Sequence, residues 1–350
     1  MSITTHERPG VYSSYGASSL IRGSGGRKTV GLAAVNTKAT ADTVYTITSY
    51  EQAVSVFGDA GSMAELIRVI LLNGAAAVAA VPLADSDSYE DGFALLAAQE
   101  SVSIVVCDST TLTVQQDLRD SVASASAARR ERIAVVAGAA GETVTNLVSQ
   151  AGSLNSERVV LVAPGGVDED GTALPGVTAA AAVAGALAAQ SDPALPLSGA
   201  ELSGLHGLSQ QYSDNDIDLL VRGGVTPLES TGGVVSVVRG ITTRTKTGEA
   251  ADTTWRELST ILIVDDVIPS IREALRAKFR RAKNTEQSRG AIRSQVVLEL
   301  ENKLSREIIT GYENVTVSAD EENPTVCLVE FSFTVAHGLN QIWLTASITI

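Results

Sequence analysis

Short apolar runs recur along the first two thirds of the chain and alternate with segments of helical spacing. The apolar runs cover residues 30–35, 76–81, 102–107, 133–136 and 159–162. Because they are apolar almost throughout, they are typical of strands buried on both faces. The helical segments cover residues 63–72, 88–98, 114–128, 142–151 and 177–189. Strands that alternate with helices predict βαβ units, so we expect an α/β domain with a parallel sheet over residues 28–240.

The pattern changes after Thr242. A long helical pattern begins at Trp255, and we expect an interruption near Pro269 because proline lacks the N–H that a helix interior uses. A second helix is expected over about residues 291–309. Strand candidates follow over residues 315–318, 325–336 and 342–350. Two helices with these strands predict a smaller α+β domain over residues 241–340.

Residues 341–350 carry no charge and read as a strand. The apolar positions on one face are Ile342, Leu344, Ala346, Ile348 and Ile350. The opposite face holds Thr345, Ser347 and Thr349. An edge strand usually carries Lys, Pro or a bulge, because its unpaired backbone groups otherwise recruit other chains. Without such protection, the segment either closes the sheet of its own domain or is donated to the sheet of a neighbouring copy.

The first 27 residues show no helical periodicity. They contain Pro9-Gly10 and the run Gly23-Ser24-Gly25-Gly26, both of which favour extended and flexible backbone. We therefore expect residues 1–27 to form an extended N-terminal arm.

Composition and charge narrow the class of protein. The chain has 350 residues, of which 44% are apolar and 4% aromatic, and its net charge is −14. This negative charge argues against a general nucleic-acid binder, whose surface should be basic. No apolar leader follows Met1, and the low-charge stretch 71–83 is too short to span a bilayer. We expect a soluble protein made in the cytoplasm, with Cys107 and Cys327 as reduced core residues.

The charge is unevenly distributed along the chain. Residues 271–306 hold ten Lys or Arg and four Glu, a net +6, so the remaining chain carries −20, since −14 minus +6 is −20. On the first helix of this segment, Arg272, Arg276 and Arg280 form a stripe beside an apolar stripe. A basic stripe of this kind is either a solvated face or a contact for an acidic partner.

The sequence shows no catalytic or metal-binding constellation. His6, His206 and His337 are isolated from one another and from both cysteines. No Walker A pattern occurs. The loop Pro164-Gly165-Gly166 follows an apolar run and could face a ligand, although it lacks a lysine and an ordinary turn fits it as well. We expect no enzymatic activity, cofactor or metal, and the alternative is an α/β enzyme with a nucleotide or small-molecule site at this loop.

Several segments, taken in order, resemble the contractile-tail sheath proteins of bacteriophages and of related injection particles. They are RPGVY at 8–12, NSERVVL at 155–161 followed by APG at 163–165, the Ala-rich stretch 178–189, DIDLL at 216–220 followed by GVTPL at 224–228, and VVRGITT at 237–243. The region 255–350 is similar to the most characteristic part of that family. The resemblance covers nearly the whole chain, and the chain is short for the family, which implies that it lacks the outer domains of larger sheaths.

The resemblance implies a structural subunit and assigns roles to residues. In this family, hexameric rings stack around a tail tube, the C-terminal domains face the tube, and terminal arms complete a sheet in neighbouring copies. The implied strand-exchange residues are Val11, Tyr12 and Tyr15 of the arm together with the five apolar positions of residues 342–350. The implied tube-facing candidates are Arg272, Arg276, Arg280, Lys283, Arg289 and Arg293.

The resemblance also implies partners and a location. The partners are copies of the same chain, the tail tube protein, and baseplate and tail terminator proteins, with no nucleic acid and no direct membrane insertion. Contraction of the rings drives the tube through a cell envelope, and the particle is a virion tail or tail-like particle assembled in the cytoplasm of the host bacterium. A tube or baseplate protein is a second alternative, although tube proteins are normally much shorter. The sequence leaves open whether the particle is a phage, a tail-like bacteriocin or another injection machine.

Overall fold

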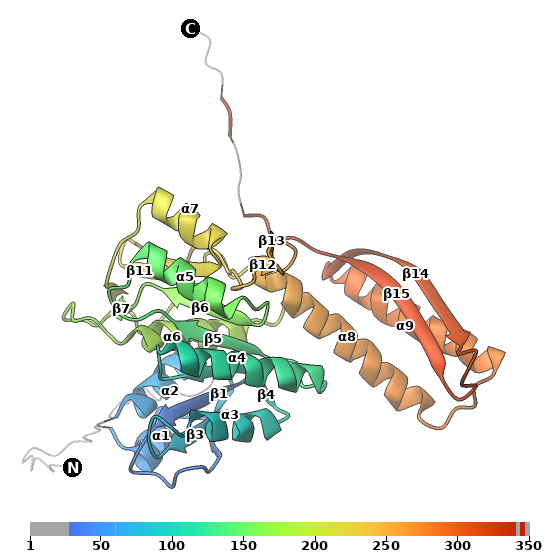
Figure 1. The fold of residues 1–350 in the computed structure, drawn as a ribbon, viewed down its shortest axis with the longest axis horizontal. Helices are drawn as coiled ribbons and strands as arrows, with labels where there is room; N and C mark the ends of the chain where they lie inside the picture. Colours follow the sequence, from blue (N-terminus) through green and yellow to red (C-terminus); the bar gives the residue numbers. More distant parts are fainter. Residues whose placement is uncertain (1–27, 60, 341–343, 347–350) are drawn as a thin grey trace, which may run out of the picture.

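The structure is a computed structural model that describes residues 28–59, 61–340 and 344–346. These residues form an α/β lobe and a C-terminal lobe, which projects from the α/β lobe along the helix α8 (Leu258–Phe279) (Figure 1). The predicted N-terminal arm lies outside the described residues, as does most of the predicted terminal strand.

The α/β lobe is built on one large twisted sheet. In spatial order its strands are β2 (Tyr45–Ile47), β3 (Ala77–Leu83), β1 (Thr29–Val35), β4 (Val102–Cys107), β5 (Ile133–Ala137), β6 (Val159–Ala163), β10 (Val225–Thr231), β11 (Val234–Val237) and β8 (Glu201–Leu202). The strands from β3 to β10 in this order run parallel, and β2, β11 and β8 add antiparallel pairs at the two sides. Two small sheets pair β7 (Gly166–Val167) with β9 (Gly207–Leu208) and β12 (Lys246–Thr247) with β13 (Ala250–Ala251).

Helices cover both faces of the large sheet (Figure 1). On one face lie α1 (Tyr50–Phe57), α2 (Ser62–Leu72) and α6 (Gly176–Ala189). On the other face lie α3 (Tyr89–Ala98), α4 (Leu112–Ala127), α5 (Val144–Leu154) and α7 (Asp214–Arg222). The prediction of an α/β domain with a parallel sheet covered on both faces is confirmed.

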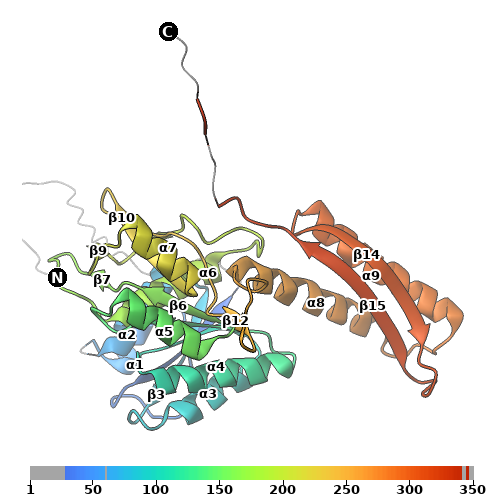
Figure 2. The same ribbon diagram turned by 45° about the horizontal axis from the view of Figure 1, so that its top comes forward.

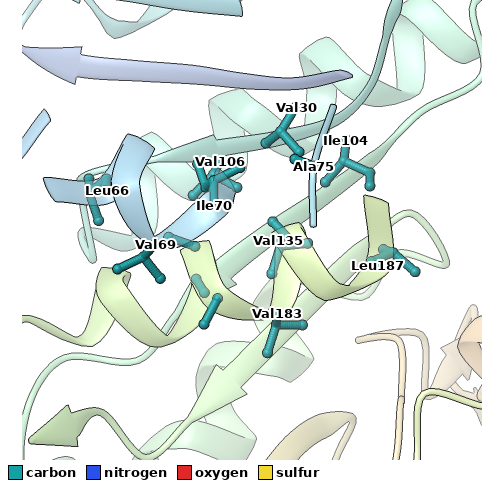
Figure 3. Packing of buried hydrophobic residues seen from close by; sticks show 14 of the residues in the cluster. Val30, Leu66, Val69, Ile70, Ala75, Ile104, Val106, Val135, Val183 and Leu187 are labelled. Carbon is teal, nitrogen blue, oxygen red and sulfur yellow. The ribbon is translucent and has the colours of Figure 1, made fainter. Parts of the chain in front are cut away.

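The alanine-rich helix α6 lies in the interior of the lobe, where it packs against α2 and the strand β5. Figure 3 shows Val183 and Leu187 of α6 in one cluster with Ile70 of α2 and Val135 of β5. Small side chains let the two helices approach closely, and a Cβ added at Gly185 would lie 2.5 Å from the carbonyl oxygen of Ile70. The small alanine side chains therefore allow α6 to pack densely against α2.

The C-terminal lobe places two helices under a β-hairpin (Figure 2). Its elements are α8, α9 (Glu286–Ser305), β14 (Ile309–Ala319) and β15 (Cys327–Val335). Side chains of both helices and of β14 form its core, among them Val267, Ile271, Val296, Leu300 and Val315. This arrangement confirms the predicted α+β class.

The prediction that Pro269 interrupts the first of these helices is wrong, because α8 runs unbroken from Leu258 to Phe279. A proline inside a helix costs about 3 kcal/mol. Burial on both sides of the proline offsets this cost: Leu258 and Ile261 pack into the core of the α/β lobe, and Ile271 packs into the core of the C-terminal lobe.

Residues 241–243, which precede α8, are buried and hydrogen-bonded to the α/β lobe. Ile241, Thr242 and Thr243 are fully buried, and the Thr243 N–H donates to the carbonyl of Val159 at 2.9 Å. The Thr226 hydroxyl donates to the Ile241 carbonyl at 2.9 Å. The two cores therefore meet within α8, which belongs to both.

Candidate assembly surfaces

The hairpin β14–β15 is a two-stranded sheet whose outer edges are unpaired among the described residues. Its register runs from the pair Ile309 and Val335 to the pair Ala319 and Cys327, with irregular steps in β14, where Asn314 has a positive φ of 55°. A two-stranded sheet is marginally stable alone and exposes rows of unpaired N–H and C=O groups. Both edges can therefore accept further strands.

The inner face of β15 carries apolar side chains that the helices cover only in part. Val329, Phe331 and Phe333 are half-buried, whereas Val267 of α8 and Leu300 of α9 are fully buried. The stacked rings of Phe331 and Phe333 have centroids 6.3 Å apart. A further strand along an open edge would extend this apolar layer and remove more of it from water.

The described part of the C-terminal segment, residues 344–346, does not pair with its own sheet. Leu339 is 76% exposed and Leu344 is 92% exposed, and residues 344–346 form no strand. Leu344 and Ala346 are thus the described members of the predicted strand-exchange set, and both are exposed. The remaining members lie outside the described residues: Val11, Tyr12, Tyr15, Ile342, Ile348 and Ile350.

Half of the predicted tube-facing residues have partners inside the subunit. Arg272 forms an ion pair with Glu131 of the α/β lobe, with 2.7 Å between Nη2 and Oε1. Arg289 donates to the Asn284 side chain at 3.0 Å. Arg293 donates to a backbone carbonyl of β14 at 2.8 Å. These contacts hold the three guanidinium groups in place within the chain.

The other three predicted tube-facing residues are exposed. Arg276, Arg280 and Lys283 form no ion pair with any described residue. All three lie at or beyond the last turn of α8, where cations interact favourably with the helix dipole. Their charges remain available to an acidic surface outside the subunit.

The alternative ligand site at Pro164-Gly165-Gly166 is filled by protein. The Gly165 carbonyl accepts hydrogen bonds from the backbone N–H of Ser209 at 2.9 Å and from its hydroxyl at 3.0 Å. The cavity beside the loop has a volume of about 10 Å³, whereas small-molecule sites occupy hundreds. The loop is a structural turn.

Among residues 28–59, 61–340 and 344–346, no three His, Cys, Asp or Glu side chains gather in a way that could hold a metal ion. No helix in those ranges is long and apolar enough to cross a membrane.

Charged contacts between the lobes have no signal in the sequence. Arg158, at the start of β6, binds both carboxylate oxygens of Asp265 on α8, at 2.7 and 2.9 Å. Within the C-terminal lobe, Lys303 binds Asp266 at 2.5 Å. The first pair joins residues 107 positions apart, so no local pattern could have revealed it.

Comparison with known protein families identifies the family of the chain. The phage tail sheath protein central domain matches residues 84–243, and the phage tail sheath C-terminal domain matches residues 250–349. The chain therefore belongs to the phage tail sheath protein family. It is a structural component of a phage tail or tail-like particle, and the prediction that it is not an enzyme is confirmed.

Individual relatives agree with this assignment. The tail sheath protein of Bacillus phage SP01 is 28% identical over 221 residues, which are 61% of this chain and 37% of that protein. The chain thus spans little more than a third of that relative.

Solved structures share the fold at low sequence identity. The helical sheath of the anti-feeding prophage in its contracted state has a TM-score of 0.74 at 15% identity, covering 98% of this chain and 99% of that one. A sheath tail protein from Listeria innocua has a TM-score of 0.73 at 14% identity, covering 90% and 93%. A sheath tail protein from Desulfitobacterium hafniense has a TM-score of 0.71 at 12% identity, covering 93% and 100%.

Proposed function

We propose that the chain polymerises into hexameric rings that stack around a tail tube, and that contraction of the stack drives the tube through a cell envelope. The observation that carries this proposal is the hairpin β14–β15, which has two edges that are unpaired among the described residues and a half-covered apolar face. Such a sheet is completed by strands from other copies. The particle is assembled in the cytoplasm of the host bacterium. The stack of rings contacts baseplate and tail terminator proteins at its ends.

The donated strand is the C-terminal segment 342–350. It has nine residues, like β15, and its apolar positions alternate as the inward positions of β15 do. Several ladder hydrogen bonds would each contribute about 1 kcal/mol net, and the apolar side chains would add burial. The N-terminal arm, with Val11, Tyr12 and Tyr15, is the second connector. Connections of this strength between subunits remain intact while the rings rotate and compress.

The tube contact is weaker and is made by the exposed cations at the end of α8. Arg276, Arg280 and Lys283 have no ion-pair partner among the residues that the structure describes. Exposed ion pairs contribute about 0–1 kcal/mol each. A contact of this kind can position the sheath on an acidic tube wall and still break during contraction.

A matched pair of substitutions tests the donated strand. Leu344 and Thr345 are adjacent and both exposed, and they lie on opposite faces of the predicted strand. Leu344→Asp loses about 1.5–3 kcal/mol of side-chain burial and places a carboxylate against an apolar layer. We expect this variant to stay folded but to form no sheath, as judged by sedimentation and electron microscopy.

Thr345→Asp is the control, because it introduces the same charge on the face that remains polar. We expect it to assemble, as the unaltered chain does. Deletion of residues 342–350 should reproduce the defect of Leu344→Asp. Normal sheaths from the deletion variant would rule out the donated strand.

A further inference from the structure

The turn Asn155–Arg158 joins the α/β lobe to the segment that leads out of it. The Asn155 side-chain oxygen accepts the N–H groups of Thr245 and Lys246 at 3.0 and 3.1 Å. Ser156 donates its N–H to the Thr243 hydroxyl at 3.0 Å and accepts from it at 3.0 Å. The turn lies in the sequence segment NSERVVL at 155–161. The proposed assembly assigns no role to this segment.

Arg158 extends this connection to α8. Its two hydrogen bonds to Asp265 form a bidentate pair, and both side chains are largely buried, at 14% and 15% exposure. Burial raises the pKa of Asp265, and the Arg158 guanidinium opposes that shift. A bidentate pair of planar groups fixes their relative orientation, not only their distance.

A second ion pair repeats the arrangement farther along the same helix. Arg272 lies seven residues after Asp265, which is about two turns or about 10 Å along one helix face. It binds Glu131, whose side chain is 16% exposed. Glu131 precedes β5 and Arg158 precedes β6, so both partners come from the amino ends of neighbouring parallel strands.

Apolar packing of α8 on the core of the α/β lobe ends after its first turns, and Ala194 of the α/β lobe packs against the core of the C-terminal lobe. The last side chains of α8 that pack against the core of the α/β lobe are Leu262 and Val264. Beyond them, a cavity of about 820 Å³ separates the α/β lobe from α8. Asp265, Arg272 and Arg276 lie on its α8 side, and Arg129 and Glu100 lie on the opposite side. A helix beside such a space could tilt unless polar contacts held it.

We propose that the ion pairs Arg158–Asp265 and Glu131–Arg272 set the angle between the two lobes. Arg158 and Glu131 are positioning residues, and the turn Asn155–Arg158 anchors the base of α8. Buried ion pairs contribute little net stability compared with apolar side chains, but they can select one arrangement among several. Where the chain assembles as proposed above, this angle fixes the distance between the outer lobe and the tube-facing lobe.

The test measures the distance between the lobes in the unassembled 350-residue chain. Spin labels on Ser124→Cys of α4 and Gln287→Cys of α9, both exposed positions, report this distance by pulsed electron resonance in a Cys327→Ser background. Glu131→Arg places two guanidinium groups opposite each other and should broaden and shift the distance distribution. The double variant with Arg272→Glu restores an opposite pair and should restore the narrow distribution.

Asp218→Asn is the control, because it removes the exposed pair of Asp218 with Arg222 on α7. It should leave the distance unchanged. Glu131→Gln, an isosteric change with circular dichroism as a check of folding, covers the case in which Glu131→Arg fails to fold. An unchanged distribution in a folded Glu131 variant, or a charge swap that does not restore it, overturns the proposal. The readout needs no polymer, so its failure is distinct from a failure of the proposed sheath function.

Discussion

At the scale of single residues, spacing along a helix identified neighbours but not distant partners. The stripe of Arg272, Arg276 and Arg280 was visible in the sequence, yet Arg272 binds Glu131, which is 141 positions away. The sequence alone could not separate this arginine from Arg276 and Arg280, because all three share one pattern. Arg272 differs from Arg276 and Arg280 because the fold brings the amino end of β5, where Glu131 lies, next to α8.

Two helical glycines provide a prediction at this scale. A Cβ at Gly185 of α6 would lie 2.5 Å from the Ile70 carbonyl oxygen and 2.7 Å from the Cβ of Asn73. Backbone cannot give way as a side-chain end can, so Gly185→Ala should lower the free energy of unfolding by about 1–3 kcal/mol. Chemical denaturation of the unassembled chain measures this.

Gly152→Ala in α5 is the matched change, because no atom beyond the adjacent backbone of α5 lies within 4 Å of the added Cβ. It should raise the free energy of unfolding by about 0.4–1 kcal/mol, since alanine restricts the unfolded chain. Equal effects of the two substitutions would contradict the close packing of α6 on α2.

At the scale of elements, the long periodic segments were predictable and the short or context-dependent ones were not. The predicted strands and helices of the α/β lobe are present, with shifted ends. Strands of two residues, such as β7 and β12, carry no period and were missed. Pro269 indicated a break that tertiary packing prevents. The terminal strand stays a prediction, since residues 344–346 form no strand within one subunit.

The cationic end of α8 gives the prediction for an element. Reversing Arg276 and Arg280 to Glu should weaken assembly around the tube more than tube-free polymerisation, because an acidic tube wall then faces anions. Pelleting with purified tube across a salt series measures this.

The control reverses Arg222 and Lys246, which are exposed on the α/β lobe and change the net charge equally. It should leave tube binding intact. Should both double variants bind tube with the same yield and salt dependence, the cations of α8 are only a solvated face.

At the scale of the whole molecule, the class of each lobe could be predicted but their arrangement could not. Continuous apolar runs indicated a parallel sheet, whereas the strand order follows from long-range packing that no local pattern contains. The open edges of β14 and β15 likewise became visible only in the folded lobe. The donor segment stays a prediction from the sequence, and the proposal places it at the edges of β14 and β15 that are unpaired among the described residues.

The most direct test of the assembly is a helical reconstruction of the polymer formed by the purified chain. We expect hexameric rings in which the sheet of β14 and β15 gains strands from neighbouring copies, with residues 342–350 of one copy on an edge of another. A polymer in which this sheet stays two-stranded, or is completed by the C-terminal segment of the same subunit, would contradict this expectation.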